Sequence, residues 1–221
     1  GPDVSVGDLN GDGLDDFIVG GAVYNPTTLY FQTSKGFVKQ QNMAIESDSG
    51  YEDLGSLIFD ADGDGDNDIY MVSGGNEFSA DSKMLQDRLY VNNGQGGFTK
   101  STSALPKMLT SGLRVSIIDY DKDGDLDLFV GGRLVPKNYP LPANSYILEN
   151  VSTKGKPKFI DVTKKIAPEL EELGMVTSSL WSDYDNDGQI DLIVVGEWMP
   201  ITIFKNNKGS FKNITKDLNL D

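Results

Sequence analysis

The stretch DADGDGDND, residues 60–68, carries an aspartate at every second position and contains no lysine or arginine. Carboxylates this close repel one another, so the arrangement is costly unless a cation or a set of hydrogen-bond donors compensates the charge. The aspartates stand at places 1, 3, 5, 7 and 9 of the stretch, and glycine stands at place 6. This is the spacing of a calcium loop, in which alternate oxygens turn inward around a sharp glycine turn.

The same pattern occurs in three further stretches of the chain. They are DLNGDGLDD at 8–16, DYDKDGDLD at 119–127 and DYDNDGQID at 183–191. Each has Asp or Asn at places 1, 3 and 5, Gly at place 6 and Asp at place 9. A single acidic turn can be no more than solvated surface, but four copies in one frame favour metal sites.

The residues after each loop exclude the EF-hand, which needs a bidentate Glu at place 12 and a helix on each side. Place 12 is apolar in every copy: Val19, Met71, Val130 and Val194. The runs that follow the loops are FIVGG, IYMVSGG, LFVGG and LIVVGE. Short apolar runs that end at glycine indicate buried strands and not amphipathic helices. The dockerin module is excluded for the same reasons.

Each loop is therefore a hairpin between two strands, and two more strand-like segments follow it in every unit. The first aspartates of the loops are separated by 52, 59 and 64 residues. A repeat of this length with four strands predicts a β-propeller or a related array. We expect an all-β fold and one domain over residues 1–221, with four four-stranded antiparallel blades. The expected blades are at about 4–40, 54–101, 113–163 and 177–215.

The loop D-x-[DN]-x-D-G-x-x-D between two strands, followed by an apolar strand that ends in Gly-Gly, resembles the FG-GAP or VCBS repeat of integrin alpha-chain propellers. The resemblance covers nearly the whole chain. VSVGDLNGDGLDDFIVGGA and DLIVVGEWMPI are most similar to the long VCBS-repeat surface proteins of Bacteroidetes-type bacteria. Related propellers usually close at about seven blades, so four blades imply part of a larger ring, with a closed four-bladed ring as the alternative.

The resemblance implies about four calcium ions, one per blade, held by the side chains at places 1, 3, 5 and 9 and by the carbonyl at place 7. These places are Asp8, Asn10, Asp12, Leu14 and Asp16; Asp60, Asp62, Asp64, Asp66 and Asp68; Asp119, Asp121, Asp123, Asp125 and Asp127; and Asp183, Asp185, Asp187, Gln189 and Asp191. The neutral Asn10 predicts a weaker first site. Gln189 should matter little, because only its carbonyl is needed.

The composition agrees with an extracellular, ion-stabilised domain. The net charge is −15, and 18 of the 34 acidic residues lie in the four loops. Nucleic acid is excluded as a partner, since phosphate contacts need clustered Lys and Arg. There is no cysteine, so calcium would replace disulfides as the stabilising element. No apolar run is long enough to insert into a membrane. We expect an extracellular or cell-surface location, on the outer surface of a bacterium.

The chain has no histidine, which removes the commonest general base and the Ser-His-Asp arrangement. We therefore predict no enzyme, although a propeller-type polysaccharide lyase that uses Tyr, Lys or Arg stays an alternative. The predicted function is a scaffold that binds other surface or outer-membrane proteins. A carbohydrate-binding module is the first alternative to this function, ahead of the lyase.

The connections after the second strand of each unit carry residue types that are frequent at binding surfaces. The candidates are Tyr24, Phe78, Arg133, Tyr139 and Trp198. Their alternative role is to pack between blades or to cover the core. Long loops of propellers are where binding functions vary, so these residues are the predicted ligand surface.

Overall fold

A computed structural model describes residues 3–220 as four sheets, each with four antiparallel strands in chain order. Blade 1 contains β1 (Val4–Gly7), β2 (Asp16–Val19), β3 (Thr28–Thr33) and β4 (Gly36–Gln40). Blade 2 contains β5 (Asp53–Phe59), β6 (Asp68–Ser73), β7 (Arg88–Val91) and β8 (Thr99–Ser101). Blade 3 contains β9 (Ser111–Ile118), β10 (Asp127–Leu134), β11 (Tyr146–Asn150) and β12 (Phe159–Asp161). Blade 4 contains β13 (Met175–Ser182), β14 (Asp191–Glu197), β15 (Thr202–Asn206) and β16 (Phe211–Asn213).

The predicted all-β fold of four four-stranded blades is confirmed. The third and fourth sheets begin at residues 111 and 175, two residues earlier than the sequence indicated, and they end at residues 161 and 213. Short helices occupy the connections: α1 (Met43–Glu46), η1 (Lys83–Leu85), α2 (Thr163–Ile166), η2 (Pro168–Leu170) and η3 (Lys216–Leu218). None of the helices in residues 3–220 has the length and apolar character needed to cross a membrane.

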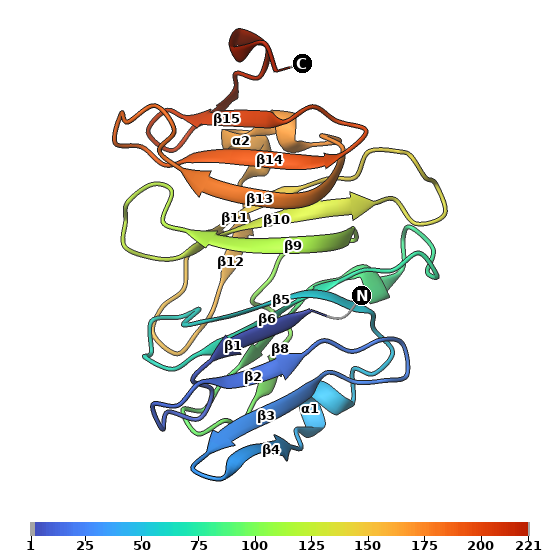
Figure 1. The fold of residues 1–221 in the computed structure, drawn as a ribbon, viewed down its shortest axis with the longest axis vertical. Coiled ribbons are helices and arrows are strands. Elements are labelled where there is room, and N and C mark those ends of the chain that lie inside the picture. The colour runs from blue at the N-terminus through green and yellow to red at the C-terminus, as the bar shows by residue number, and fades with distance from the viewer. Residues whose placement is uncertain (1–2, 221) are drawn as a thin grey trace.

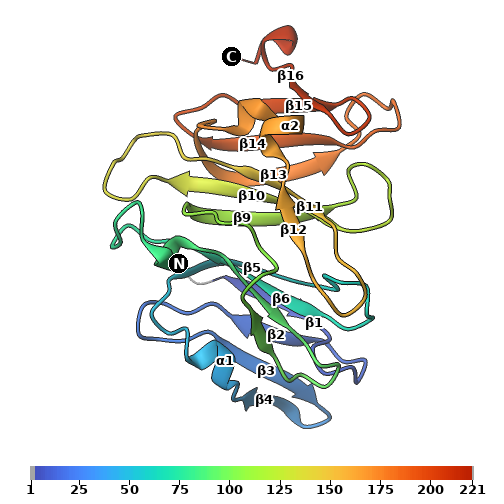
Figure 2. The same ribbon diagram turned by 180° about the vertical axis from the view of Figure 1, so that it is seen from behind.

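The blades stack along the long axis of the molecule in chain order, with blade 1 at one end and blade 4 at the other (Figures 1 and 2). The first strands of successive blades, β1, β5, β9 and β13, adjoin one another. This is how the innermost strands of propeller blades follow one another around the axis. Because blades 1 and 4 lie far apart, the described residues form an open array and not a closed four-bladed ring.

Apolar side chains fill the space between each pair of neighbouring blades. In β6, Ile69 and Met71 belong to the cluster shared with blade 1, whereas Tyr70 and Val72 belong to the cluster shared with blade 3. Successive side chains of a strand point to opposite faces. A central blade therefore buries both faces, which explains the continuous apolar runs after the acidic loops.

The connections between strands define two sides of the array. The hairpin loop between β9 and β10 projects to the left in Figure 1, and the connection from β10 to β11 projects to the right. We call the side of the four acidic hairpins the loop side. The side of the connections after the second strands, which carries the predicted ligand residues, is the opposite side.

Candidate metal centres and ligand surface

Each acidic loop folds around the aspartate at its first place. Asp60 accepts hydrogen bonds from the backbone N–H groups of Gly63 at 2.8 Å and Gly65 at 3.0 Å. The first aspartates of the other three loops also accept the N–H of place 6, together with the N–H of place 4 in the first loop and of place 5 in the third and fourth loops. The glycine at place 6 has a φ between 82° and 101° in all four loops, a conformation that side chains disfavour. The loop therefore requires the glycine that the sequence repeats.

The aspartate at place 9 connects the loop to the rest of its blade. Asp68 is buried and accepts hydrogen bonds from the N–H groups of Ala61 at 3.1 Å and Asn92 at 2.8 Å. The other closing aspartates, Asp16, Asp127 and Asp191, accept the same two bonds in their blades. Burial raises the pKa of Asp68 and of Asp127 to about 7, against the lowering effect of these bonds.

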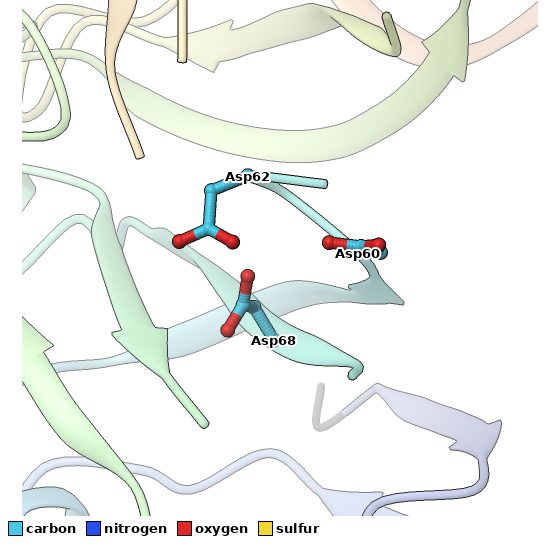
Figure 3. Close-up of side chains that lie close together, drawn as sticks. All are labelled: Asp60, Asp62 and Asp68. Atoms are coloured by element: carbon cyan, nitrogen blue, oxygen red, sulfur yellow. The ribbon is translucent and has the colours of Figure 1, made fainter. Parts of the chain in front are cut away.

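In three loops the carboxylates at places 1, 3 and 9 converge, so that one oxygen from each lies within 4.8 Å of the others. The groups are Asp60, Asp62 and Asp68 (Figure 3); Asp119, Asp121 and Asp127; and Asp183, Asp185 and Asp191. The first loop has the amide Asn10 at place 3 and so lacks a third carboxylate there.

The residues at place 5 stand outside these groups in the part of the chain that the structure describes. Asp12, Asp64, Asp123 and Asp187 accept the N–H of place 7, which belongs to Leu14, Asp66, Asp125 and Gln189. In the structure, the predicted ligands at place 5 therefore accept a hydrogen bond that stabilises the turn.

The surroundings of Asp62 fit a bound cation. Asp62 is only 4% exposed, and neither of its carboxylate oxygens has a hydrogen-bond partner. A cavity of about 190 Å³ lies beside it, lined also by Asp60 and by residues 124–126 of the next loop. Burial and the nearby charge of Asp64 raise the pKa of Asp62, against a lowering effect of the nearby backbone N–H groups of Gly155 and Asp64. An all-oxygen donor set of this kind suits a hard divalent ion such as calcium.

An asparagine at the end of the third strand ties each later blade to the loop of the blade before it. The Asn92 amide donates to the carbonyl of Leu9 in the first loop, at 2.9 Å, and to that of Asn67 in its own loop, at 2.7 Å. Asn150 and Asn206 repeat this pair of bonds at the next two boundaries. These asparagines are not among the residues predicted from the sequence, although each stands at the end of a repeated strand segment: RLYVNN, YILEN and TIFKNN.

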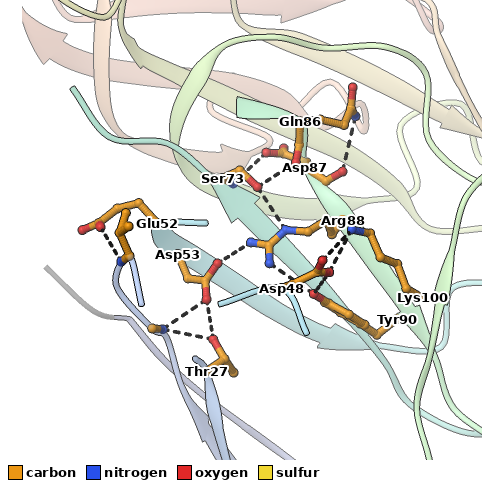
Figure 4. A network of polar contacts seen from close by, with 12 residues as sticks. Thr27, Asp48, Glu52, Asp53, Ser73, Gln86, Asp87, Arg88, Tyr90 and Lys100 are labelled. Atoms are coloured by element: carbon orange, nitrogen blue, oxygen red, sulfur yellow. Dashed lines mark hydrogen bonds and ion pairs between the residues drawn. The ribbon is translucent and has the colours of Figure 1, made fainter. Parts of the chain in front are cut away.

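On the opposite side, a polar network around a buried ion pair of blade 2 reaches blade 1 through Thr27 (Figure 4). Arg88 pairs with Asp53, which also accepts the hydroxyl of Thr27 at 2.6 Å. Arg88 donates further to Ser73 at 3.2 Å and to Tyr90 at 3.1 Å. Because these bonds pair the buried charged groups, we interpret the network as a structural connection between blades.

Three of the five predicted ligand residues lie together. The indole N–H of Trp198 in blade 4 donates to the hydroxyl of Tyr139 in blade 3 at 2.7 Å. Arg133 pairs with Glu197, the neighbour of Trp198, at 2.7 Å. Trp198 is 76% exposed and Tyr139 is 61% exposed. We call Arg133, Tyr139, Glu197 and Trp198 the aromatic platform.

The other two predicted ligand residues lie elsewhere. Tyr24 is exposed on a connection of blade 1, and Phe78 is half-buried beside Gly75 on a connection of blade 2. Within residues 3–220, direct side-chain contacts thus unite only the three residues of blades 3 and 4, although the connection of Phe78 meets that of Tyr139 where the Lys137 N–H donates to Asn76 at 2.7 Å. The aromatic platform is the part of the predicted ligand surface whose side chains are held together by contacts.

The FG-GAP-like repeat family matches residues 8–71 and 60–130. The chain therefore belongs to the FG-GAP-like repeat family, and the predicted relation to FG-GAP or VCBS repeats is confirmed. A closer relation to Bacteroidetes-type proteins stays a prediction. No curated protein matches the sequence.

Among solved structures, the fold is similar to that of a lectin from Agrocybe aegerita, described for its specific recognition of non-reducing terminal N-acetylglucosamine. The TM-score is 0.58 at 20% sequence identity, over 96% of this chain and 51% of the lectin chain. The chain thus spans about half the length of that lectin. At this level of identity the likeness shows the fold alone.

Proposed function

We propose that this protein is a calcium-stabilised β-propeller module that binds carbohydrate at an extracellular or cell-surface location. The aromatic platform on the opposite side is the observation that carries the proposal. It presents two exposed aromatic rings from neighbouring blades beside an Arg-Glu pair.

The platform has the chemistry that sugars require. Aromatic rings offer apolar faces for the C–H groups of a pyranose, while their polar tips and the charged pair offer hydrogen bonds to hydroxyls. The indole of Trp198 is positioned by its bond to Tyr139, so little conformational freedom is lost on binding. The lectin of similar fold supports this choice of ligand class.

Calcium would act on the scaffold and not on the sugar. The acidic hairpins lie on the loop side, away from the platform, so an ion there would hold hairpins in place. The unpaired buried oxygens of Asp62 support a cation in the second loop, and the triads of the third and fourth loops support two more. Because Asn10 stands where the other loops have a carboxylate, an ion in the first loop would bind more weakly than in the other loops.

The test is binding of the whole chain to an array of glycans that includes terminal N-acetylglucosamine. Trp198→Ala should reduce binding at least tenfold. Tyr24→Ala is the matched control, since Tyr24 is an 85% exposed tyrosine on the corresponding connection of blade 1, and it should bind like the wild type. Absence of glycan binding, or equal loss in both variants, would contradict the proposal.

A protein-binding scaffold is the second candidate, and one sheet face favours it. Val4 and Val6 are 56% and 60% exposed, while Ser5 between them bonds to Ser56 of blade 2 at 2.7 Å. The two valines therefore point away from blade 2. Phe37 is exposed on the same face, where the ring of Phe17 packs against it at 4.9 Å.

The equivalent faces of the later blades are covered by the preceding blade, so this face suits a further blade of the same kind, as in a larger propeller. Light scattering should show concentration-dependent association of the chain, reduced in Val6→Ser. A monomer at all concentrations in both proteins would count against this candidate.

A further inference from the structure

Lys205 places a positive charge inside the fourth acidic loop. It lies on β15, and its ammonium contacts Asp185 at place 3 and Asp187 at place 5, the latter at 3.0 Å. Both carboxylates are predicted calcium ligands. A side chain of the third strand, far outside the loop motif, therefore already binds one member of the converging carboxylate group, Asp185, and the place-5 aspartate beside it.

The position of Lys205 is equivalent in all four blades, because the next residue donates its N–H to the closing aspartate of the loop. For Lys205 that next residue is Asn206, which donates to Asp191 at 2.7 Å. The equivalent residues are Phe31, Val91 and Glu149. Blade 4 is thus the one described blade with a cation at this position.

The other side chains at this position leave their loops without such a charge. Phe31 packs into the cluster between blades 1 and 2. Glu149 accepts a hydrogen bond from Tyr120, at place 2 of the third loop, at 3.2 Å, which adds a negative charge near that loop. The motif is the same in the third and fourth loops, but the adjacent strand contributes charges of opposite sign.

A divalent cation and an ammonium compete for the same carboxylates. Two positive charges within about 5 Å repel each other appreciably even at the high effective dielectric of an exposed site. An ion that enters the fourth loop must therefore displace the ammonium from Asp185 and Asp187. The displaced lysine then loses both of its ion pairs.

We propose that Lys205 weakens calcium binding at the fourth loop, so that this loop fills only after the second and third loops. The same residue holds the fourth loop together when calcium is scarce. This inference rests on the proposed binding of calcium to the acidic hairpins.

The test uses the whole chain and calcium chloride in titration calorimetry. Lys205→Met should tighten one calcium site roughly tenfold and leave the others unchanged. In excess chelator the same variant should melt at a lower temperature than the wild type, because the carboxylates lose their counter-charge. Lys35→Met, which removes an equal charge from a turn of blade 1, is the control and should change neither quantity. The gain should disappear in an Asp185→Asn background.

The reciprocal variant is Glu149→Lys, which should weaken one calcium site by a similar factor. If the wild type, Lys205→Met and Glu149→Lys all bind calcium with the same affinities, the proposed role of Lys205 is wrong. The proposed binding of calcium would still hold in that case. If none of these proteins binds calcium, the proposed calcium binding fails and this inference fails with it.

Discussion

The second and fourth loops share one motif but differ in how their charge is compensated. In the second loop the oxygens of Asp62 are buried without partners beside a cavity. In the fourth loop Asp185 is exposed and already pairs with Lys205. The difference arises outside the motif. The next blade covers the second loop, whereas the fourth loop is exposed and meets Lys205 of its own third strand. A repeated sequence therefore does not imply a repeated site.

Removal of calcium should give the largest effect and should separate the two loops. Each site filled a hundredfold above its dissociation constant contributes about 2.7 kcal/mol, so excess chelator should lower the melting temperature by roughly 10 °C or more. Hydrogen exchange followed by mass spectrometry should show a greater loss of protection in residues 60–68 than in residues 183–191. Equal loss in both segments would remove the distinction between the loops.

The pH dependence of the calcium-free protein should give the next largest effect. The pKa of Asp68 is raised to about 7 in the folded protein, from an ordinary value of 3.8, so the folded state binds the proton more tightly than the unfolded state. Stability should therefore fall as the pH rises from 5 to 8, on the order of 2 kcal/mol for this group.

Denaturant unfolding at several pH values in chelator would measure this slope. Asp68→Asn should reduce it, while Asp127 and the buried Asp87, whose pKa values are also raised to about 7, should preserve part of it. A stability that rises over the same range would show that the sign is wrong.

A pair of single substitutions at place 3 should give the smallest effect, with opposite signs in the two loops. In chelator, Asp62→Asn should raise the free energy of unfolding by about 1 kcal/mol, because it removes a buried charge without a partner. Asp185→Asn should lower it slightly, because it removes a partner of Lys205.

With calcium present, both place-3 variants should be less stable than the wild type, since each loses a proposed ligand. Urea unfolding with and without calcium would measure all four differences. The same sign for both variants in chelator would mean that Lys205 does not compensate the fourth loop.

The sequence predicted the local features of the molecule well. The hairpins, the glycine turns and the strands follow from residues adjacent in the chain, and the structure contains all of them. The roles of Lys205 and Asn150 depend on which face of a third strand meets a loop, and that face is set by packing between blades. The bond between Tyr139 and Trp198 joins residues 59 positions apart, so their proximity could not be derived from spacing.

The asparagine contacts between blades give the array a direction. Each boundary has a donor, the amide on the third strand, and an acceptor, the carbonyl at place 2 of the preceding loop. A duplicated blade therefore carries both the donor asparagine and the acceptor carbonyl. Any number of units can be added in the same orientation. The carbonyl of Tyr184 in the fourth loop is the next such acceptor, and within residues 3–220 no asparagine of another blade reaches it. Growth of such a protein by gene duplication needs no new interface to evolve.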